Sequence, residues 1–376
     1  MAINLQSVIA AIEAKAAAAD STTPISDLYK IIIEANEVGI PMGVYDSAGV
    51  MPIDSAYVGS VFSTPAGGLY VLDSAGGSWQ TADGSPTPIP FTVQGTQYGY
   101  QMAGWVPAQN VIDKFPFPSD ANATDVGDLT VARYDPSAGK SATDGYVLQG
   151  YPSPTGVVDK FSFASGGNAV SPTTTRYNYG SSYSQDESNI FLLGGNVVNN
   201  TIDKFATATE TNTTGVGSLV LNAYDMTGNS SSTNGYSSGG ATPTQQDTIQ
   251  KFPFAITSGS STDVGNLIGV RSQAAGASSD THGYLANGSP TAASLQKFPF
   301  ASDGNAASVG TLAFNDGNYS SGNESTDNGY STGAYGNFGG ATSYGIVQKW
   351  PFASDNNAVG VGVLSVRRFH TAGVSY

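Results

Sequence analysis

The chain has 376 residues, of which only 11% are charged, and its formal net charge at pH 7 is −15. We do not expect such an acidic protein to bind nucleic acid, because phosphate binding requires clustered Lys and Arg side chains. Cysteine is absent, which excludes disulfides, thiolate metal sites and a cysteine nucleophile.

Residues 1–40 predict a helical anchor of two short amphipathic helices, one over residues 2–19 and one that begins after Ser26. Charged residues interrupt the apolar run near the start, and a signal-peptide pattern is missing, so we expect neither membrane insertion nor ordinary secretion. Helices this short are not stable alone, so we expect them to pack against sister chains, giving a homo-oligomer, or against another protein. The expected anchor interface consists of Leu5, Val8, Ile9, Ile12, Leu28, Ile31 and Ile32.

Residues 41–84 predict a small β-hairpin module. Strand-forming segments at 58–63 and 69–72 flank a Pro-Ala-Gly-Gly turn, and a second glycine pair precedes Trp79. The Pro-rich segment 85–90 is expected to be a linker into the last domain, residues 91–376.

One β-rich unit then repeats six times. Each copy has a short strand built around a Lys-aromatic pair, and these lysines are spaced by 46, 44, 47, 46 and 52 residues. The six lysines are Lys114, Lys160, Lys204, Lys251, Lys297 and Lys349. A Gly-Tyr step or its equivalent precedes each lysine, and an apolar stretch follows it. Several of these stretches end in arginine, as at Arg133, Arg176, Arg271 and Arg367.

A period in the mid-forties with several strand signals is typical of one four-stranded propeller blade. We therefore expect a mainly β protein with a six-bladed β-propeller. The chain ends in a segment that aligns with the first-strand segment of an internal blade, Arg271 to Gly276, but no Gly-Tyr strand follows it. We expect this C-terminal strand to complete the first blade and close the ring, which leaves no open sheet edge. The six lysines are interpreted as structural, with packed stems and paired amines.

Two resemblances follow from these residues. The third blade, with Phe191-Leu192-Leu193-Gly194-Gly195 followed by Thr201-Ile202-Asp203-Lys204-Phe205, resembles the kelch propeller family, although the usual tryptophan is mostly phenylalanine here. The phrases at 69–73 and 77–80, and the repeat form at 113–129, are similar to those of tailed-bacteriophage virion proteins. The second resemblance implies a virion protein that is made in the host cytoplasm and released by lysis.

Few residues of the repeats are candidates for catalysis. His282 occupies a position that is Asp144, Asn234 or Asn328 in other blades, so we interpret it as a turn residue. His370 lies in the expected closing strand, and spacing identifies no Ser or acidic partner for it. The acids mostly recur in loops, and no EF-hand pattern appears. We expect no catalytic residue, metal or cofactor, and the protein is not expected to be an enzyme.

Aromatic residues in the variable segments are the best candidates for binding, because tyrosine in polar loops can stack on sugar rings or anchor a protein contact. The alternative for each is packing between blades. The candidates are Tyr183, Tyr224 and Tyr319, together with Tyr335 and Phe338 in the insertion that lengthens the sixth repeat.

These observations favour a non-enzymatic phage virion structural protein. Its N-terminal region would attach to other virion proteins, and its propeller would project as a fibre or spike that meets a host-surface glycan or protein. One alternative is an architectural protein that decorates the head, neck or capsid. Another is a carbohydrate-active, depolymerase-like enzyme, because propellers also host glycosidases and lyases.

Overall fold

The computed structural model describes four short strands in the N-terminal region and most of the chain from residue 93 onward. The described residues are 42–44, 61–63, 69–72, 79–81, 93–152, 156–197, 200–290, 293–314, 318–333, 336–338, 341–343 and 345–376. They belong to two compact units, residues 1–91 and 92–376, and each is described by itself. The expected N-terminal helices and all the residues of the expected anchor interface lie outside the described residues. Among the described residues, no helix has the length and hydrophobicity needed to cross a bilayer.

The first unit contains a four-stranded sheet with the order β1-β2-β3-β4. Its strands are β1 (Met42–Val44), β2 (Val61–Ser63), β3 (Leu69–Leu72) and β4 (Trp79–Thr81). Strands β2, β3 and β4 pair antiparallel, which agrees with the turn sequences between them. Strand β1 pairs with β2 in parallel and is not indicated by the sequence pattern.

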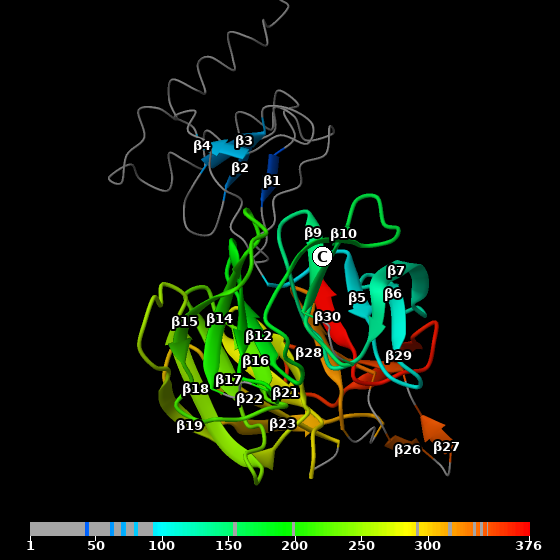
Figure 1. Cartoon of the computed structure of the whole chain (residues 1–376). Coiled ribbons are helices and arrows are strands. Elements are labelled where there is room, and N and C mark those ends of the chain that lie inside the picture. Colours follow the sequence, from blue (N-terminus) through cyan, green and yellow to red (C-terminus); the bar gives the residue numbers. More distant parts are fainter. Residues whose placement is uncertain are drawn as a thin grey trace, which may run out of the picture. The chain divides into compact units, whose positions relative to one another are not determined.

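The second unit is a six-bladed β-propeller whose blades are four-stranded antiparallel sheets (Figure 1). Blade 1 contains β30 (Ala372–Ser375), β5 (Tyr98–Met102), β6 (Gln109–Pro116) and β7 (Thr124–Arg133). Blade 2 contains β8 (Ser137–Lys140), β9 (Asp144–Leu148), β10 (Val157–Ser162) and β11 (Val170–Thr174). Blade 3 contains β12 (Ser182–Gln185), β13 (Asn189–Leu193), β14 (Thr201–Ala206) and β15 (Thr214–Ser218).

Blades 4 to 6 repeat this order. Blade 4 contains β16 (Thr227–Ser230), β17 (Asn234–Ser238), β18 (Gln246–Pro253) and β19 (Thr262–Arg271). Blade 5 contains β20 (Ala275–Ser278), β21 (His282–Ala286), β22 (Ser294–Pro299) and β23 (Ala307–Thr311). Blade 6 contains β24 (Ser321–Glu324), β25 (Asn328–Thr332), β28 (Ile346–Pro351) and β29 (Val359–Val363). The insertion between β25 and β28 forms the hairpin of β26 (Gly336–Phe338) and β27 (Ala341–Ser343).

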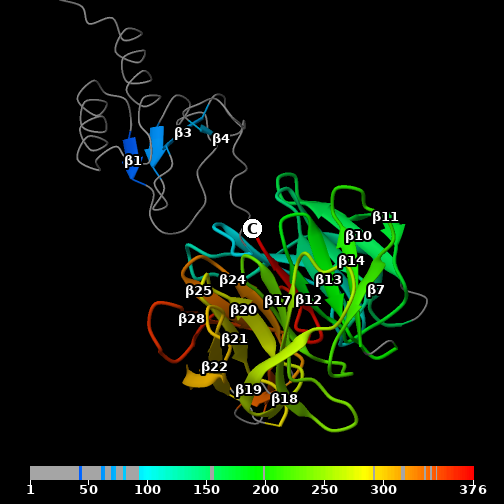
Figure 2. The same ribbon diagram turned by 90° about the vertical axis from the view of Figure 1, so that its left-hand side faces the viewer.

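The first strand of each blade is the innermost one. Neighbouring inner strands contact one another, and Figure 2 shows β20 and β24 together near the red C-terminal segment. Strand β30 pairs with β5 in blade 1 and also contacts β8 of blade 2 and β24 of blade 6. The C-terminal strand therefore lies among the inner strands, between the first-strand positions of its two neighbours.

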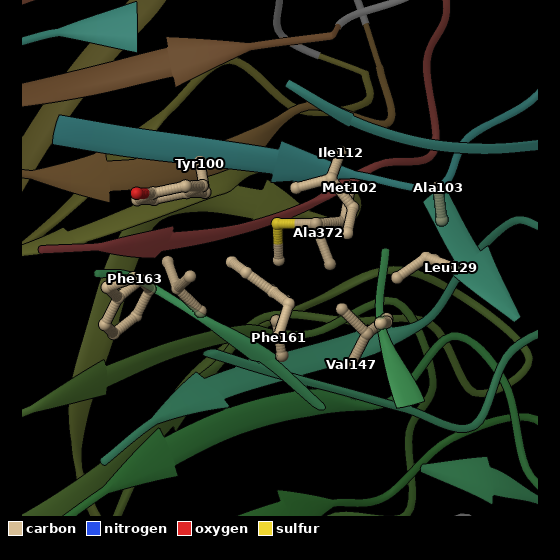
Figure 3. Packing of buried hydrophobic residues seen from close by; sticks show 12 residues of the cluster. Tyr100, Met102, Ala103, Ile112, Leu129, Val147, Phe161, Phe163 and Ala372 are labelled. Carbon is tan, nitrogen blue, oxygen red and sulfur yellow. The ribbon is translucent and has the colours of Figure 1, made fainter. Parts of the chain in front are cut away.

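Aromatic side chains join each blade to the next. In each blade, the aromatic side chain at the tyrosine position of the Gly-Tyr step packs against the next blade. Its contacts there are the aromatic residues of the strand that contains the repeat lysine. Tyr100 of blade 1 lies 5.3 Å from Phe161 and 5.2 Å from Phe163 of blade 2, measured between ring centroids, and Figure 3 shows these side chains pointing toward one another. Blade 6 meets blade 1 in the same way, since Tyr330 stacks on Phe117 at 4.8 Å.

The glycine of the Gly-Tyr step provides space for this packing. In five blades the aromatic ring of the neighbouring strand lies directly over it, and a Cβ atom would come within 2.3–2.4 Å of that ring. These glycines are Gly99, Gly145, Gly235, Gly283 and Gly329. Blade 3 has Ile190 instead, and the space is supplied from blade 2, where a Cβ on Gly139 would lie 2.6 Å from the Ile190 side chain.

The repeat lysines form inter-blade ion pairs, which agrees with their structural interpretation. Each of four lysines reaches an acid in the next blade, with N–O distances of 2.5–2.6 Å. The pairs are Lys160–Glu210, Lys251–Asp303, Lys297–Asp355 and Lys349–Asp120. Lys114 instead lies 4.4 Å from the centre of the Tyr98 ring. Each partly exposed pair contributes about 0–1 kcal/mol, so these links supplement the aromatic packing.

The residue before each repeat lysine makes a second inter-blade link. Asp159 accepts a 2.7 Å bond from Arg133 and Asp113 a 2.8 Å bond from Arg368, and all four side chains are fully buried. Arg368, rather than the expected Arg367, therefore fills this role before blade 1. In blades 4, 5 and 6 glutamine replaces aspartate and accepts a backbone N–H of the preceding blade at 2.9–3.0 Å. At this repeat position, aspartate therefore occurs where an arginine pairs with it, and glutamine occurs in blades 4, 5 and 6.

The aromatic contact between blades 6 and 1 is tested by substituting Tyr330, whose side chain is 1% exposed. Tyr330→Ala should lower the free energy of unfolding by about 3–5 kcal/mol, since it removes a large buried ring. Tyr330→Phe is the control, because it keeps the ring. Equilibrium urea unfolding measures both variants, and equal stability of wild type and Tyr330→Ala would contradict the role given to this contact.

Candidate functional site

A ring of six residues surrounds one end of the propeller axis. Each lies in the connection from the outermost strand of one blade to the innermost strand of the next, and each has a left-handed backbone, with φ between 52° and 63°. The six are Asp135, Gly180, Asp225, Gln273, Tyr319 and His370. The backbone N–H of each donates to the carbonyl oxygen of the preceding one at 2.8–3.2 Å, and the sixth bond returns to the first residue. We call these residues the axial ring.

The axial ring presents its side chains around a small hollow of about 90 Å³. Nδ1 of His370 lies within hydrogen-bond distance of Oδ1 of Asp135. The Gln273 amide donates to Oδ2 of Asp225 at 2.8 Å. Gly180 makes room for that carboxylate, because a Cβ at this position would lie 2.7 Å from Oδ1 of Asp225. The hollow therefore combines two acids, an amide, an imidazole and a phenol.

Asp225 has the most altered chemistry of these groups. Loss of solvation raises its pKa to about 6, and the negative charge of Asp135 adds to the effect. The hydrogen bond from Gln273 and the charge of His370 act in the opposite direction. Asp225 can consequently exchange a proton near neutral pH, and an acid perturbed in this way within a hollow marks a candidate functional site.

Aromatic side chains extend from the axial ring across the adjacent surface. We define the aromatic shelf as Trp105, Tyr134, Tyr151, Tyr177 and Tyr179. Successive ring centroids are 4.7 Å apart for Trp105–Tyr134, 5.1 Å for Tyr134–Tyr151, 5.3 Å for Tyr151–Tyr179 and 6.0 Å for Tyr177–Tyr179. Tyr134 also lies 5.7 Å from the ring of His370. Trp105 is 41% exposed and Tyr151 is 38% exposed, so the shelf offers a solvent-facing aromatic row.

The aromatic shelf is not a requirement of the blade fold. Tyr134 and Tyr151 form a backbone bridge at the ring end of blade 2, and in blade 5 the equivalent bridge joins Ser272 to Ser289. In blade 4 the equivalent of Tyr151 is Ala241, which pairs with Tyr224. Because two serines satisfy the same backbone geometry in blade 5, this bridge does not require aromatic residues.

Beyond the axial ring, residues of the inner strands of all six blades line a second hollow of about 120 Å³. Tyr183, from inner strand β12, crosses to β30 and donates its hydroxyl to the Gly373 carbonyl at 2.8 Å. Toward the opposite end lie the buried ammonium of Lys140 and the Glu324 side chain, whose opposite charges attract each other. Burial lowers the pKa of Lys140 and raises that of Glu324.

A segment that leads into the propeller covers this opposite end. Nζ of Lys140 donates to the Gln94 carbonyl at 3.1 Å, and the amide of Gln94 donates to the Ser278 carbonyl at 2.9 Å. The N–H of Gly95 donates to the Glu324 carbonyl at 2.9 Å. The two ends of the axis therefore differ, since one carries the axial ring and the other the incoming chain.

The structure distributes the binding residues expected from sequence over several places. Tyr319 belongs to the axial ring, and its ring centroid lies 3.5 Å from that of His370. Tyr224 precedes Asp225 at the same end, whereas Tyr183 lies inside the axis. Tyr335 and the side chain of Phe338 lie outside the described residues.

The two histidines have different positions. His282 begins β21, and its N–H donates to Oγ of Ser279 at 3.0 Å, which closes the same tight turn as Asn234 and Asn328 in their blades. His370 precedes β30 instead of lying in the closing strand as expected, and its contact with Asp135 joins residues 235 positions apart, which spacing could not identify.

Sequence reasoning also missed the two acids and the amide of the axial ring. One signal was present, since a single repeat position holds Asp, Gly, Asp, Gln, Tyr and His in the six copies. Such variation at a position with constant backbone conformation indicates that the fold does not require a particular side chain there.

The arrangement is suited to stacking, hydrogen bonding and proton exchange with a polar ligand. Within the described residues, no three His, Asp or Glu side chains are placed to hold a metal ion together. Comparison with models of known protein families and with curated protein sequences found no match.

The raised pKa of Asp225 predicts a pH-dependent gain in stability for Asp225→Asn. Well below pH 3.8 the acid is protonated in the folded and unfolded states, so the substitution should change little. Between pH 3.8 and about 6 only the unfolded wild type ionises this carboxyl group, so the folded wild type loses relative stability, which the neutral amide avoids. Thermal unfolding measured at several pH values should show the Tm of the variant rising relative to that of wild type as the pH increases. A Tm difference that does not change with pH would contradict the raised pKa.

Proposed function

We propose that the chain is a structural protein of a tailed-bacteriophage virion and that its kelch-like propeller, closed by the C-terminal strand, binds a host or partner molecule. The N-terminal region would attach it to the particle as part of a fibre or spike. The repeat phrases of the sequence, which are similar to those of phage virion proteins, support the virion assignment. The two unequal ends of the propeller axis support the binding role.

The observation that carries the binding role is the difference between the two ends of the propeller axis. The chain enters the propeller at the Lys140 and Glu324 end, where Gln94 and Gly95 are hydrogen-bonded to inner strands. The axial ring and the aromatic shelf lie at the other end. A protein held through the chain that precedes residue 93 would leave this second end available for a ligand, and loops at one rim of a repeat scaffold commonly carry function.

A carbohydrate-active enzyme is the second candidate. The pair of Asp135 and Asp225 favours it, because glycoside cleavage uses two carboxyl groups of which one has a raised pKa. Release of reducing sugar by the full-length chain would distinguish this activity from binding alone. An architectural decoration protein would instead show no affinity for host cells.

Closure by the C-terminal strand predicts the effect of truncation. Removal of residues 372–376 deletes β30, which pairs with β5, and the Tyr376 ring, which stacks on Phe163 at 4.6 Å. The truncated chain should lose cooperative unfolding and aggregate, because an unpaired inner edge is exposed. Val363→Ala, on an exposed position of β29, is the control. Unchanged cooperativity in thermal unfolding of the truncated chain would refute this closure.

The virion assignment predicts that purified particles contain the protein in a fixed copy number. Quantitative mass spectrometry of virions from the encoding phage measures this number against the major capsid protein. Antibodies against the propeller, followed by gold labelling, should mark a defined position on the particle. Its absence from purified virions would end the proposal.

A further inference from the structure

We propose that the axial ring and the aromatic shelf together bind a glycan whose sugars carry no acidic groups. This inference rests on the proposed binding role and names its ligand class. The terminal sugar would meet the axial ring, and the following sugars would lie on the shelf.

The shelf supplies the apolar part of the recognition. Pyranose rings have faces of C–H groups that pack against aromatic rings, and Trp and Tyr offer such surfaces together with polar tips. Trp105 and Tyr151 are the two shelf residues with the greatest exposure, and Tyr134 lies between them with ring centroids 4.7 Å and 5.1 Å away. A row of this kind accommodates successive rings of an oligosaccharide.

The axial ring supplies the polar part. Asp135, Asp225 and Gln273 carry planar polar groups that can bond pairs of sugar hydroxyls, and their backbones are held by the closed hydrogen-bond ring. The hollow of about 90 Å³ is much smaller than the several hundred Å³ of pockets that enclose a whole ligand. It therefore fits the end of a glycan, while the rest of the ligand remains outside on the shelf.

The charges around the hollow select against acidic sugars. The titratable groups of the axial ring are Asp135, Asp225, Tyr319 and His370, and the histidine is already paired with Asp135. Arg133 and Arg368 are buried in ion pairs with other aspartates, and Arg271 is buried against the Asn287 carbonyl and the Ser294 hydroxyl. Arg176, next to the shelf, is paired with Asp203. A carboxylate-bearing sugar would meet the carboxyl groups of Asp135 and Asp225 that line the hollow, and these would not repel a neutral or amino sugar.

Binding can be measured with the full-length chain on a printed array of hexasaccharides. The acid-free probes are malto-, cello-, manno-, xylo- and chito-oligosaccharides and deacetylated chito-oligosaccharide, and oligogalacturonate is the acidic probe. We expect binding to at least one acid-free probe and none to oligogalacturonate. The assignment would be overturned if the chain bound none of the acid-free probes, or if it preferred the acidic probe.

Two variants connect binding to the shelf. The double substitution Trp105→Ala with Tyr151→Ala should weaken binding at least about tenfold, because exposed aromatic anchors dominate such contacts. Ser289→Ala is the matched control, since Ser289 is the blade 5 equivalent of Tyr151. Thermal unfolding shows that each variant is folded. Equal loss in both variants, or no loss in the double variant, would refute the role of the shelf.

A cell-binding experiment separates glycan from protein as the ligand. Binding of the full-length chain to host cells should be lost after periodate oxidation of surface sugars and should survive protease treatment. The reverse pattern would identify a protein partner and overturn the glycan assignment. Presence in virions together with failure on the array would remove only this assignment, whereas absence from virions would remove the proposed function.

Discussion

The packing of aromatic rings between blades is the interaction on which the remaining structure depends. A single four-stranded blade cannot cover both faces of its sheet, so its stability comes from the neighbours on either side. Tyr100, Tyr236 and Tyr330 each place a ring against two aromatic residues of the next blade. The repeat lysines and the buried Arg–Asp pairs add polar links between blades, and burial of these rings adds hydrophobic free energy at the same boundaries.

The uniformity of the scaffold makes its departures informative. In most blades one residue type is required at a given place, such as the glycine that lies under an aromatic ring, and Ile190 is tolerated only because Gly139 is its neighbour. The axial ring shows the opposite behaviour, since its backbone is nearly constant while its side chains differ in almost every blade. The scaffold thus determines where these side chains are held and leaves their chemistry free.

The difference between the two ends of the propeller axis connects the scaffold with the proposed role. Tyr183 reaches into the axis, the segment around Gln94 covers one end of it, and the axial ring lines a hollow at the other end. Burial raises the pKa of Asp225, and the negative charge of Asp135 adds to this effect. Groups whose pKa is shifted in this way are typical of functional sites.

The repeat sequence alone determined the number of blades, the strand around each Lys-aromatic pair and the structural role of the lysines. These features are local, because a strand and its turns are encoded within one period of about 45 residues. The candidate site was decided only by the tertiary structure. Asp135, Asp225 and His370 come from three different connections, and 235 residues separate Asp135 from His370, which it contacts. Only the circular arrangement of blades brings such residues together, so no spacing along the chain could reveal them.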